Sequence, residues 1–485
     1  MFIWFILAPM KKSILLLLTL ITLVACKSKN EPDTFGQEVP LNVDNTVAYS
    51  MDNRVIYEMN LYNFTKEGTL AAAEARLAEL RTLGIDIVWL MPIQPRSQQG
   101  KIGSLGSPYA LHDYTAVNSH HGTMDDFQSF VNSAHALGME VWLDWVPNHT
   151  GLDHVWVTEH PDYYQHSGSQ IVHPNNYSDV YQLDYSNPDM CAAMQQAMIY
   201  WITNADVDGF RCDYVSSPQI PADFWEATIP MLQEAAGRKI WMLGEADFAD
   251  KSALYKVGFD YDYAWGFHDR VKLYLGTTDA AGRLQAQCQT LLNNGNYTNM
   301  DRMVYLTNHD DIGDNFSENY FGYHGDNVAP LTVVEFTLYG MPLLYNGQEI
   351  GYKKVQNYFN RDIIYWDNPN KQLQNTIRTL VALRHTQPAL AGGKKADRPT
   401  TTFLKCSNSA FMAYTKVKDD NMVLVVINLA DKMAECDIQG IAEGIYVQCL
   451  NSETIADRIV QRDVQFTSTT HFELPKKGYA VFVKR

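Results

Sequence analysis

Residues 123–149 read TMDDFQSFVNSAHALGMEVWLDWVPNH and contain one complete helix and one strand. Thr123 and Asp126 have the spacing of a helix N-cap and its partner, and Gly138 has the position of a helix stop. Apolar residues recur between them at helical spacing: Phe127, Phe130, Val131, Ala134 and Leu137. Residues 139–144 then predict a buried strand. The stretch therefore predicts a helix that covers one strand of a parallel sheet.

The same alternation of strand and helix continues on both sides of this stretch. The helix before Gly84 carries Leu70, Ala73, Leu77 and Leu80 on one face. The predicted strands are residues 55–59, 85–91, 139–144, 209–213, 240–245, 259–263, 303–306 and 342–345. Eight strands in about 335 residues favour a closed (β/α)8 TIM barrel, an α/β fold, over an open doubly wound sheet.

Two segments depart from this alternation. Residues 151–186 are irregular and predict a short inserted subdomain after the third strand, before Asn187 and Pro188 start the next helix. From about residue 401 onward, period-two runs without helical stretches predict antiparallel strands. We therefore expect a catalytic barrel over residues 51–395 and a C-terminal antiparallel β-sandwich over residues 396–485.

The N-terminal segment has the features of an export signal. Lys11 and Lys12 precede an apolar run that is short for a membrane span, and a small residue precedes Cys26. This pattern resembles a bacterial lipoprotein signal over residues 1–26, with lipid attached at Cys26 and an uncleaved anchor as the alternative. Residues 27–50 are polar and predict a flexible tether. We expect an exported, membrane-anchored protein on the periplasmic side or the outer cell surface.

The composition excludes several classes of protein. Among the 485 residues, 46% are hydrophobic, which excludes intrinsic disorder. The 55 acidic residues exceed the 38 basic ones and give a formal charge of -17, so nucleic acid is not expected as a partner. The six cysteines after Cys26 lack the spacing of a zinc site.

Four polar clusters follow predicted strands, at residues 144–149, 209–213, 244–245 and 308–310. The carboxyl ends of barrel strands converge on one face, where catalytic groups gather. Strand alternation places Arg211 and Asp213 on the same side, so that Arg211 can keep Asp213 ionised. A single polar residue at a strand end is more often a cap than a catalyst. Four such clusters together predict an active site.

These four clusters resemble, in order, the four signature regions of the α-amylase family, glycoside hydrolase family 13. The resemblance covers about residues 54–485 and includes residues 56–58, 106–109 and 345–349. It implies a retaining hydrolase of α-glucosidic bonds, chiefly α-1,4, in starch-derived glucans or maltooligosaccharides. No cofactor is expected for the chemistry itself.

The resemblance also implies individual roles. Asp213 would be the nucleophile, Glu245 the general acid and then base, and Asp310 a ligand of sugar hydroxyls in the transition state. The implied substrate-binding residues are Tyr109, which would stack on the sugar, Arg211, and the hydroxyl donors His149 and His309. A retaining mechanism predicts a separation of roughly 5 Å between the carboxyl groups of Asp213 and Glu245.

Some positions depart from the family pattern and leave alternatives open. Ser216 and Ser217 stand where many endo-acting amylases carry a Lys-His pair. Asn148 matches a calcium ligand of many relatives, and a hydrogen-bonding role without an ion is the alternative. A transglycosylase would use the same intermediate as a hydrolase. A non-catalytic glucan-binding lipoprotein would have lost Asp213 or Glu245, and both are present.

Overall fold

The computed structural model describes residues 51–485, apart from residues 176, 248–255, 275–276, 278, 294–299, 314–323, 395–396 and 453–461. The predicted signal, its lipidation site Cys26 and the tether over residues 27–50 lie outside the described residues. In the part of the chain that is described, no helix is both long enough and apolar enough to cross a membrane.

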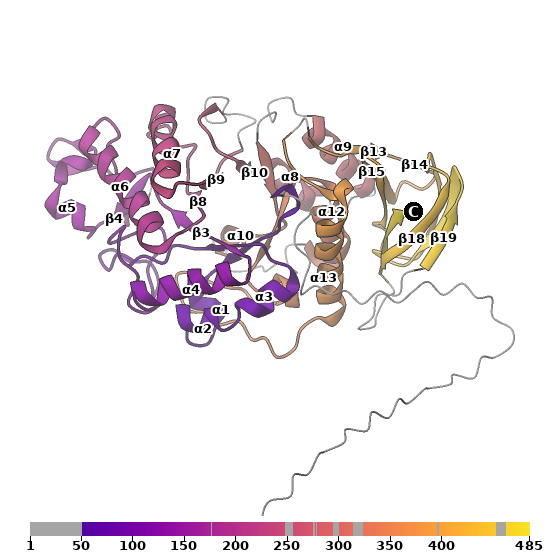
Figure 1. Ribbon diagram of the computed structural model, residues 1–485, viewed down its shortest axis with the longest axis horizontal. Helices are drawn as coiled ribbons and strands as arrows, with labels where there is room; N and C mark the ends of the chain where they lie inside the picture. The colour runs from indigo at the N-terminus through magenta and orange to yellow at the C-terminus, as the bar shows by residue number, and fades with distance from the viewer. Residues whose placement is uncertain are drawn as a thin grey trace, which may run out of the picture. The chain divides into compact units, whose positions relative to one another are not determined.

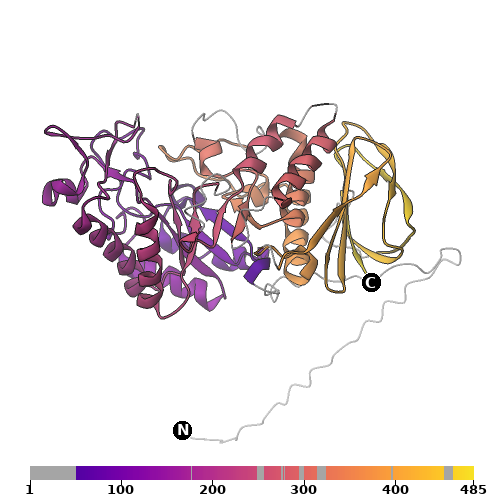
Figure 2. The same ribbon diagram turned by 90° about the horizontal axis from the view of Figure 1, so that it is seen from above.

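Eight parallel strands form a closed barrel in the order β1-β12-β11-β10-β9-β8-β3-β2 (Figures 1 and 2). The strands are β1 (Ile56–Met59), β2 (Ile87–Leu90), β3 (Glu140–Trp145), β8 (Gly209–Cys212), β9 (Trp241–Gly244), β10 (Tyr261–Tyr263), β11 (Asp301–Val304) and β12 (Met341–Tyr345). The predicted barrel is confirmed. The seventh strand starts at Asp301 rather than residue 303, because Asp301 already pairs with Tyr261 of β10.

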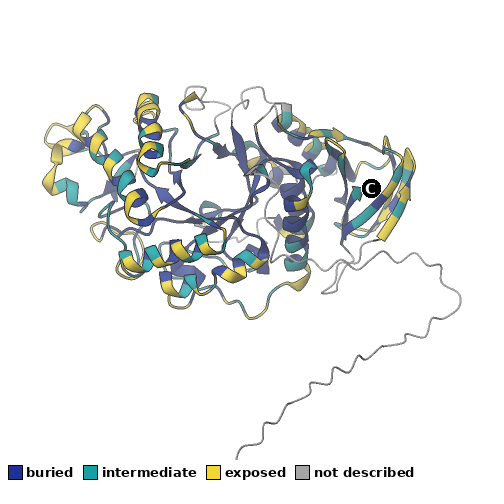
Figure 3. Ribbon diagram, viewed as in Figure 1, coloured by how far each residue is buried: buried dark blue, intermediate teal, exposed yellow. Residues whose placement is uncertain are grey.

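Helices surround this barrel. They are α1 (Leu61–Phe64), α2 (Leu70–Glu74), α3 (Leu77–Leu83), α4 (Met124–Ala136), α6 (Pro188–Ala205), α7 (Ala222–Ala236), α8 (Trp265–Tyr274), α9 (Ala280–Asn293), α10 (His309–Gly313), α12 (Val328–Leu338) and α13 (Lys371–Thr386). The helix predicted around residues 70–80 is two helices, α2 and α3. Its predicted apolar face is nevertheless buried in both. Figure 3 shows the same division, with buried strands inside and exposed outer helix surfaces.

Helix α4 begins as the sequence predicts. The Thr123 hydroxyl accepts from Asp126 N at 3.2 Å, and the Asp126 carboxylate accepts from Thr123 N at 2.7 Å. This reciprocal pair satisfies two backbone donors at the helix start. The helix ends next to Gly138, which has a φ of 73°. The chain then enters β3, whose far end contributes to the site.

The barrel interior is filled by side chains from alternate strand positions. Ile56, Trp89, Trp142, Leu243 and Met303 belong to one buried inner cluster. Intervening residues, such as Val88 and Leu143, face the helices in a separate cluster. This packing closes the centre of the barrel, so polar residues at the carboxyl ends of the strands form the floor of an open mouth.

The irregular segment after β3 folds back on the barrel. Strand β4 (His149–Gly151) pairs with β7 (Val180–Gln182) in antiparallel fashion, and the pairing places His149 opposite Gln182. Between these strands lie α5 (Val155–Glu159), the 3-10 turn η3 (Pro161–Tyr163), β5 (His166–Ser167) and β6 (Gln170–Ile171). Asn187 caps the following helix, α6, with Pro188 as its first residue, as predicted.

The C-terminal strands form two antiparallel sheets that share a core. One sheet contains β13 (Thr400–Phe403), β15 (Phe411–Lys418), β16 (Asn421–Asn428), β21 (Tyr479–Lys484), β18 (Gly444–Asn451) and β19 (Arg462–Phe466). The other contains β14 (Lys405–Cys406), β17 (Ala434–Gln439) and β20 (Thr469–Leu474). Their facing residues form one buried cluster, as in a sandwich. Lys416 Nζ donates to the Leu338 carbonyl at 2.7 Å and so joins this sandwich to helix α12.

Two glycines with left-handed backbones allow a matched test of the barrel. Gly340 (φ 66°) precedes β12, and a Cβ there would overlap the Arg302 carbonyl oxygen. Gly138 (φ 73°) has no atom within 4 Å of an added Cβ. We expect Gly138→Ala to lower the free energy of unfolding by about 1 kcal/mol, from backbone strain alone. Gly340→Ala should cost about 1–3 kcal/mol more, measured by urea denaturation. Equal losses in the two variants would contradict the predicted clash.

Candidate active site

Arg211 lies at the centre of the polar groups in the barrel mouth. It is the third residue of β8, and its side chain is fully buried. The guanidinium contacts three carboxylates, those of Asp144 at 3.0 Å, Asp213 at 3.1 Å and Glu245 at 2.9 Å. Its Nε donates to the Tyr263 hydroxyl at 2.9 Å. One cation thus joins acids that lie in or directly after β3, β8 and β9.

The backbone fixes the two acids that follow β8 and β9. Asp213 N donates to the Trp145 carbonyl at 2.8 Å, and Glu245 N donates to the Cys212 carbonyl at 2.9 Å. Both residues therefore continue the barrel hydrogen bonding beyond the strand ends. Arg211 and Asp213 lie on the same side of the strand, as alternation predicts, and Cys212 packs into the helix-facing core.

The residue after Asp213 turns the chain toward Glu245. Tyr214 has a φ of 41°, in the left-handed region that a bulky residue rarely adopts. In this conformation Tyr214 N donates to Glu245 Oε2 at 2.6 Å, while Glu245 Oε1 pairs with Arg211. Backbone conformations of this kind are maintained by surrounding contacts and are often found at functional sites.

Exposure separates the residues that can reach a ligand from those that hold them in place. The side chains of Asp213, Glu245 and Asp310 are 13%, 14% and 44% exposed. In contrast, Arg211, Glu58 and His309 are at most 1% exposed. The three partly exposed carboxyls therefore form the accessible surface of the network.

Burial changes the proton affinity of these acids. Desolvation raises the pKa of Asp213 to about 6, although Arg211 opposes this shift. Desolvation also raises the pKa of Glu245, to about 7; Arg211 opposes this shift, and the charges of Asp213 and Asp310 add to it. Near neutral pH the arrangement therefore favours an ionised Asp213 beside a Glu245 that still carries a proton part of the time.

His309 connects Asp310 to a buried carboxylate on β1. His309 Nδ1 bonds to Glu58, and its Nε2 lies 3.1 Å from Asp310 Oδ1 and 2.7 Å from the Tyr109 hydroxyl. Burial disfavours a charge on this ring, but Asp310 and Glu58 raise the pKa of His309 well above its ordinary value. Burial similarly acts against ionised Asp310, yet His309 and Arg211 lower the pKa of Asp310 overall. A charged imidazolium between two carboxylates follows.

Tyr109 lies beside His309 and completes the network. The two rings stack with centroids 5.3 Å apart and an interplanar angle of 28°. The Tyr109 hydroxyl donates to Asp144 Oδ2 at 3.1 Å, and Trp89 Nε1 donates to the same oxygen at 3.2 Å. The network therefore contains six of the predicted site residues: Tyr109, Arg211, Asp213, Glu245, His309 and Asp310.

Asn148 and His149 form a second group, at the last residue before β4 and the first residue of β4. Asn148 Oδ1 accepts from the Ser217 hydroxyl at 2.7 Å and from Gln182 Nε2 at 3.3 Å. His149 Nδ1 lies 3.1 Å from Asn148 Nδ2, and burial lowers the pKa of His149 to about 4, which leaves the ring neutral.

Calcium at Asn148 is a prediction that these contacts do not favour. Calcium requires an oxygen cage, and here two hydrogen-bond donors point at the amide oxygen. Over the described parts of residues 51–485, no group of three or more His, Cys, Asp or Glu side chains is placed to hold a metal ion. No step of the chemistry below depends on calcium.

Several members of the network lack a clear signal in the sequence. Glu58 is the lone acid of the apolar strand β1 and lies one residue before its end, whereas Glu245 directly follows β9, so the signal for Glu58 was weaker. Trp89 and Tyr263 read as ordinary core aromatics in the sequence, because nothing local indicates that their polar atoms reach Asp144 and Arg211. The left-handed backbone of Tyr214 has no sequence signal.

Comparison with known proteins identifies the family. The catalytic-domain profile of the alpha-amylase family matches residues 33–182 and 173–401. The chain belongs to the alpha-amylase family. Among solved structures, a noncanonic maltogenic alpha-amylase, AmyB from Thermotoga neapolitana, superposes with a TM-score of 0.77 at 25% identity, over 90% of this chain and 99% of that one.

Curated alpha-amylase family relatives include a hydrolase and a transferase. Alpha-amylase MalA of Haloarcula japonica is 26% identical over 404 residues, which cover 79% of this chain and 56% of MalA. An alpha-1,4-glucan:maltose-1-phosphate maltosyltransferase of Salinibacter ruber is 26% identical over 411 residues, which cover 77% of this chain and 58% of that enzyme. The chain thus spans little more than half the length of these two relatives.

The role of Glu58 in this alpha-amylase family site can be tested by charge removal. Glu58→Gln retains the shape but leaves His309 without its buried carboxylate, so we expect the pKa of His309 to fall. Because a hydrogen bond to a charged group contributes about 1.5–3 kcal/mol, kcat/KM on a maltooligosaccharide should fall about tenfold to a hundredfold. The measurements are the NMR titration of His309 and steady-state kinetics.

A matched control is Glu226→Gln on the exposed surface of helix α7. It should change neither the His309 titration nor kcat/KM. An unchanged His309 pKa in Glu58→Gln would contradict the proposed coupling.

Proposed function

We propose that this chain is a retaining glycoside hydrolase that cleaves α-1,4-glucosidic bonds in starch-derived glucans or maltooligosaccharides. The observation that carries this proposal is the contact of one buried guanidinium with two partly exposed carboxyls, Asp213 and Glu245. Paired carboxyls with different proton affinities are the groups that glycoside hydrolysis requires.

In this mechanism Asp213 is the nucleophile. It attacks the anomeric carbon while Glu245 donates a proton to the departing glycosidic oxygen, which leaves a glycosyl ester on Asp213. Glu245 then removes a proton from a water molecule that attacks the same carbon, so the anomeric configuration is retained. Arg211 stabilises the Asp213 carboxylate before attack and again when it departs from the sugar.

Substrate binding is assigned to the groups around these acids. Asp310, which is charged and the most exposed of the three carboxyls, accepts hydrogen bonds from sugar hydroxyls and stabilises the positive charge of the transition state. Tyr109, which is half-buried beside His309, offers its ring to the sugar face. His149, from the second group, is a hydroxyl donor at the edge of the site.

A transglycosylase is the second candidate. A sugar acceptor in place of water would intercept the same ester, and the similarity to the maltosyltransferase of Salinibacter ruber supports this alternative. Ser216 and Ser217 follow the nucleophile closely and would influence which acceptor binds there. A non-catalytic glucan-binding role is disfavoured, because Asp213, Glu245 and Asp310 are all present.

We also propose that the chain is exported and anchored to a membrane by lipid on Cys26, on the periplasmic side or the outer cell surface. The basic, apolar and small-residue pattern before Cys26 supports this location. The tether over residues 27–50 would hold the barrel away from the lipid.

The two assigned catalytic acids can be tested by isosteric substitution. Asp213→Asn and Glu245→Gln should each lower kcat on maltohexaose by about a thousandfold or more, with little change in thermal unfolding. Glu226→Gln again serves as the surface control and should retain full activity. NMR of the first product released by the unmodified chain should show the α-anomer. A β-anomer, or full activity in either variant, would refute the assignment.

The pH dependence of the reaction follows from the same two acids. Activity should fall below pH about 6, where Asp213 becomes protonated and loses its nucleophilic form, and above about pH 7, where Glu245 loses the proton it must donate. We expect a bell-shaped pH profile of kcat/KM with these two limbs. Its two apparent pKa values belong to the coupled pair and not to either residue alone. Rates that keep rising to pH 9 would be incompatible with Glu245 as the acid.

A further inference from the structure

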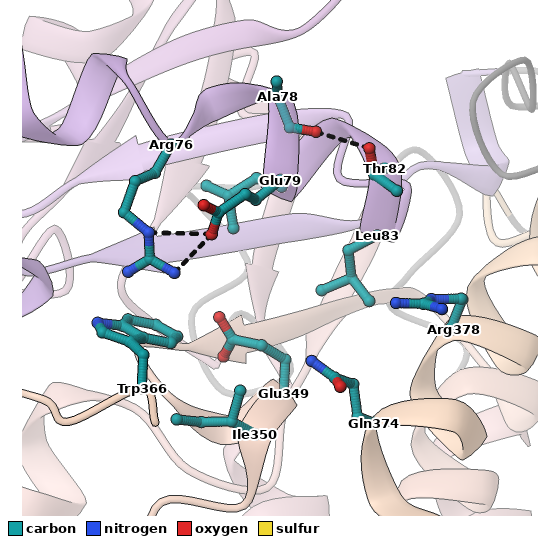
Figure 4. A pocket seen from close by; sticks show the side chains of 11 residues that line it. Arg76, Ala78, Glu79, Thr82, Leu83, Glu349, Ile350, Trp366, Gln374 and Arg378 are labelled. Atoms are coloured by element: carbon teal, nitrogen blue, oxygen red, sulfur yellow. Dashed lines mark hydrogen bonds and ion pairs between the residues drawn. The ribbon is translucent and has the colours of Figure 1, made fainter. Parts of the chain in front are cut away.

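A second cavity, with mixed polar and apolar walls, lies on the outer wall of the barrel, between the helices that follow β1 and β12. Its volume is about 410 Å³, within the range of about 300–1,000 Å³ typical of small-molecule sites. Helix α3, the 3-10 turn η6 (Gln348–Ile350) and helix α13 form its walls, and Trp366 lies at one end (Figure 4). The three carboxyls assigned to catalysis are not among the residues that line it.

The floor of this outer cavity is a buried carboxyl group. Glu349 is 4% exposed, and its Oε1 accepts a hydrogen bond from the Tyr57 hydroxyl at 2.7 Å. Its Oε2 has no hydrogen-bond partner among the described residues. Figure 4 shows the Glu349 side chain within the cavity, with Gln374 between it and Arg378. An unsatisfied buried acceptor of this kind costs stability unless water or a ligand supplies a donor.

Donors face the same space from helix α13. Arg378 Nε is buried and has no hydrogen-bond partner among the described residues. Gln374 is one helical turn before Arg378, so its amide lies on the same face of the helix. A ligand in this cavity meets the Glu349 carboxyl as an acceptor on the floor and Arg378 as a donor on one wall. The Gln374 amide lies between them and can both donate and accept hydrogen bonds.

Side-chain contacts hold the opposite end of the outer cavity together. Arg76 pairs with Glu79 at 2.7 Å, and its guanidinium carbon lies 3.8 Å from the centre of the Trp366 ring. Trp366 Nε1 donates to the Phe64 carbonyl at 2.9 Å, which fixes the indole in turn. Leu80, Leu83 and Ile350 add apolar surface. This end therefore offers apolar surface to a ligand, next to polar groups that are already held by other side chains.

The mixture of charges in these walls selects the class of ligand. An anion would approach Glu79, and a cation would approach Arg76 and Arg378, so either finds a like charge nearby. Burial raises the pKa of Glu349 to about 7, so this carboxyl carries only part of a charge near neutral pH. An uncharged molecule with several hydroxyls can accept from Arg378 at one hydroxyl and donate to Glu349 at another. A sugar ring also has an apolar face for the leucines and the indole.

We propose that this outer cavity is a second saccharide-binding site, which takes one end or a short stretch of a maltooligosaccharide. The identity of the sugar as an α-glucan rests on the proposed function, whereas the preference for an uncharged, hydroxyl-rich ligand rests on the cavity walls alone. Binding here holds a glucan against the outside of the barrel, apart from the mouth where the bond is cleaved.

The test is a calorimetric titration of the full chain with maltotriose, in an Asp213→Asn background that prevents turnover. Arg378→Met and Gln374→Leu change the cavity from the half-exposed side of helix α13, and Glu349 stays intact because it is buried. Arg283→Met, on the exposed surface of helix α9, is the matched control. Inorganic phosphate serves as the anionic probe. Circular dichroism confirms that each variant is folded.

We expect two binding events in the Asp213→Asn chain. Arg378→Met and Gln374→Leu should each weaken one of them, by about tenfold for Arg378→Met, and Arg283→Met should weaken neither. Without the Asp213 substitution, Arg378→Met should cleave a short maltoside at the unmodified rate. If the chain lacks turnover but keeps the binding event that depends on Arg378, the proposed function fails and this site stands. A single event that ignores both cavity variants, or binding of phosphate instead of maltotriose at this site, would overturn the proposal.

Discussion

The contact of Arg211 with three carboxylates is the interaction on which the barrel mouth depends. Asp144, Asp213 and Glu245 lie close together in a region from which most water is excluded, where like charges repel strongly. Burial raises the pKa of all three acids. The guanidinium partly opposes that shift. Its planar shape lets one side chain contact several carboxylates at fixed positions.

The barrel geometry explains why these groups meet. Strand β8 pairs with β3 on one side and β9 on the other, in a register that places Arg211 opposite Asp144 and Leu243. Because adjacent parallel strands lie about 4.8 Å apart, side chains at equivalent heights fall within reach of one guanidinium. The arrangement of acids in the mouth therefore depends on the strand register as well as on the residue types. The surrounding helices exclude water from the base of the mouth.

The sequence predicted those features that depend on local pattern. The eight strands, the capped start of helix α4 and the shared side of Arg211 and Asp213 all follow from periodicity and capping rules. The break between α2 and α3 did not follow, because the apolar spacing continues through it, and β11 starts at Asp301 because that residue already pairs with Tyr261 of β10. Glu58 was missed because its partner, His309, is 251 residues away in the chain.

Strand β1 carries a functional contact on each face. Tyr57 faces outward to Glu349, and Glu58 faces inward to His309. A one-residue slip of this strand would place the carboxylate under the helices and the phenol in the mouth, so side-chain chemistry pins the register as firmly as hydrophobicity does. Since β1 also pairs with β12 to close the ring, the strand that completes the barrel also brings Glu58 to His309. A chain whose barrel is still open would carry its acid and its nucleophile but no buried carboxylate for His309.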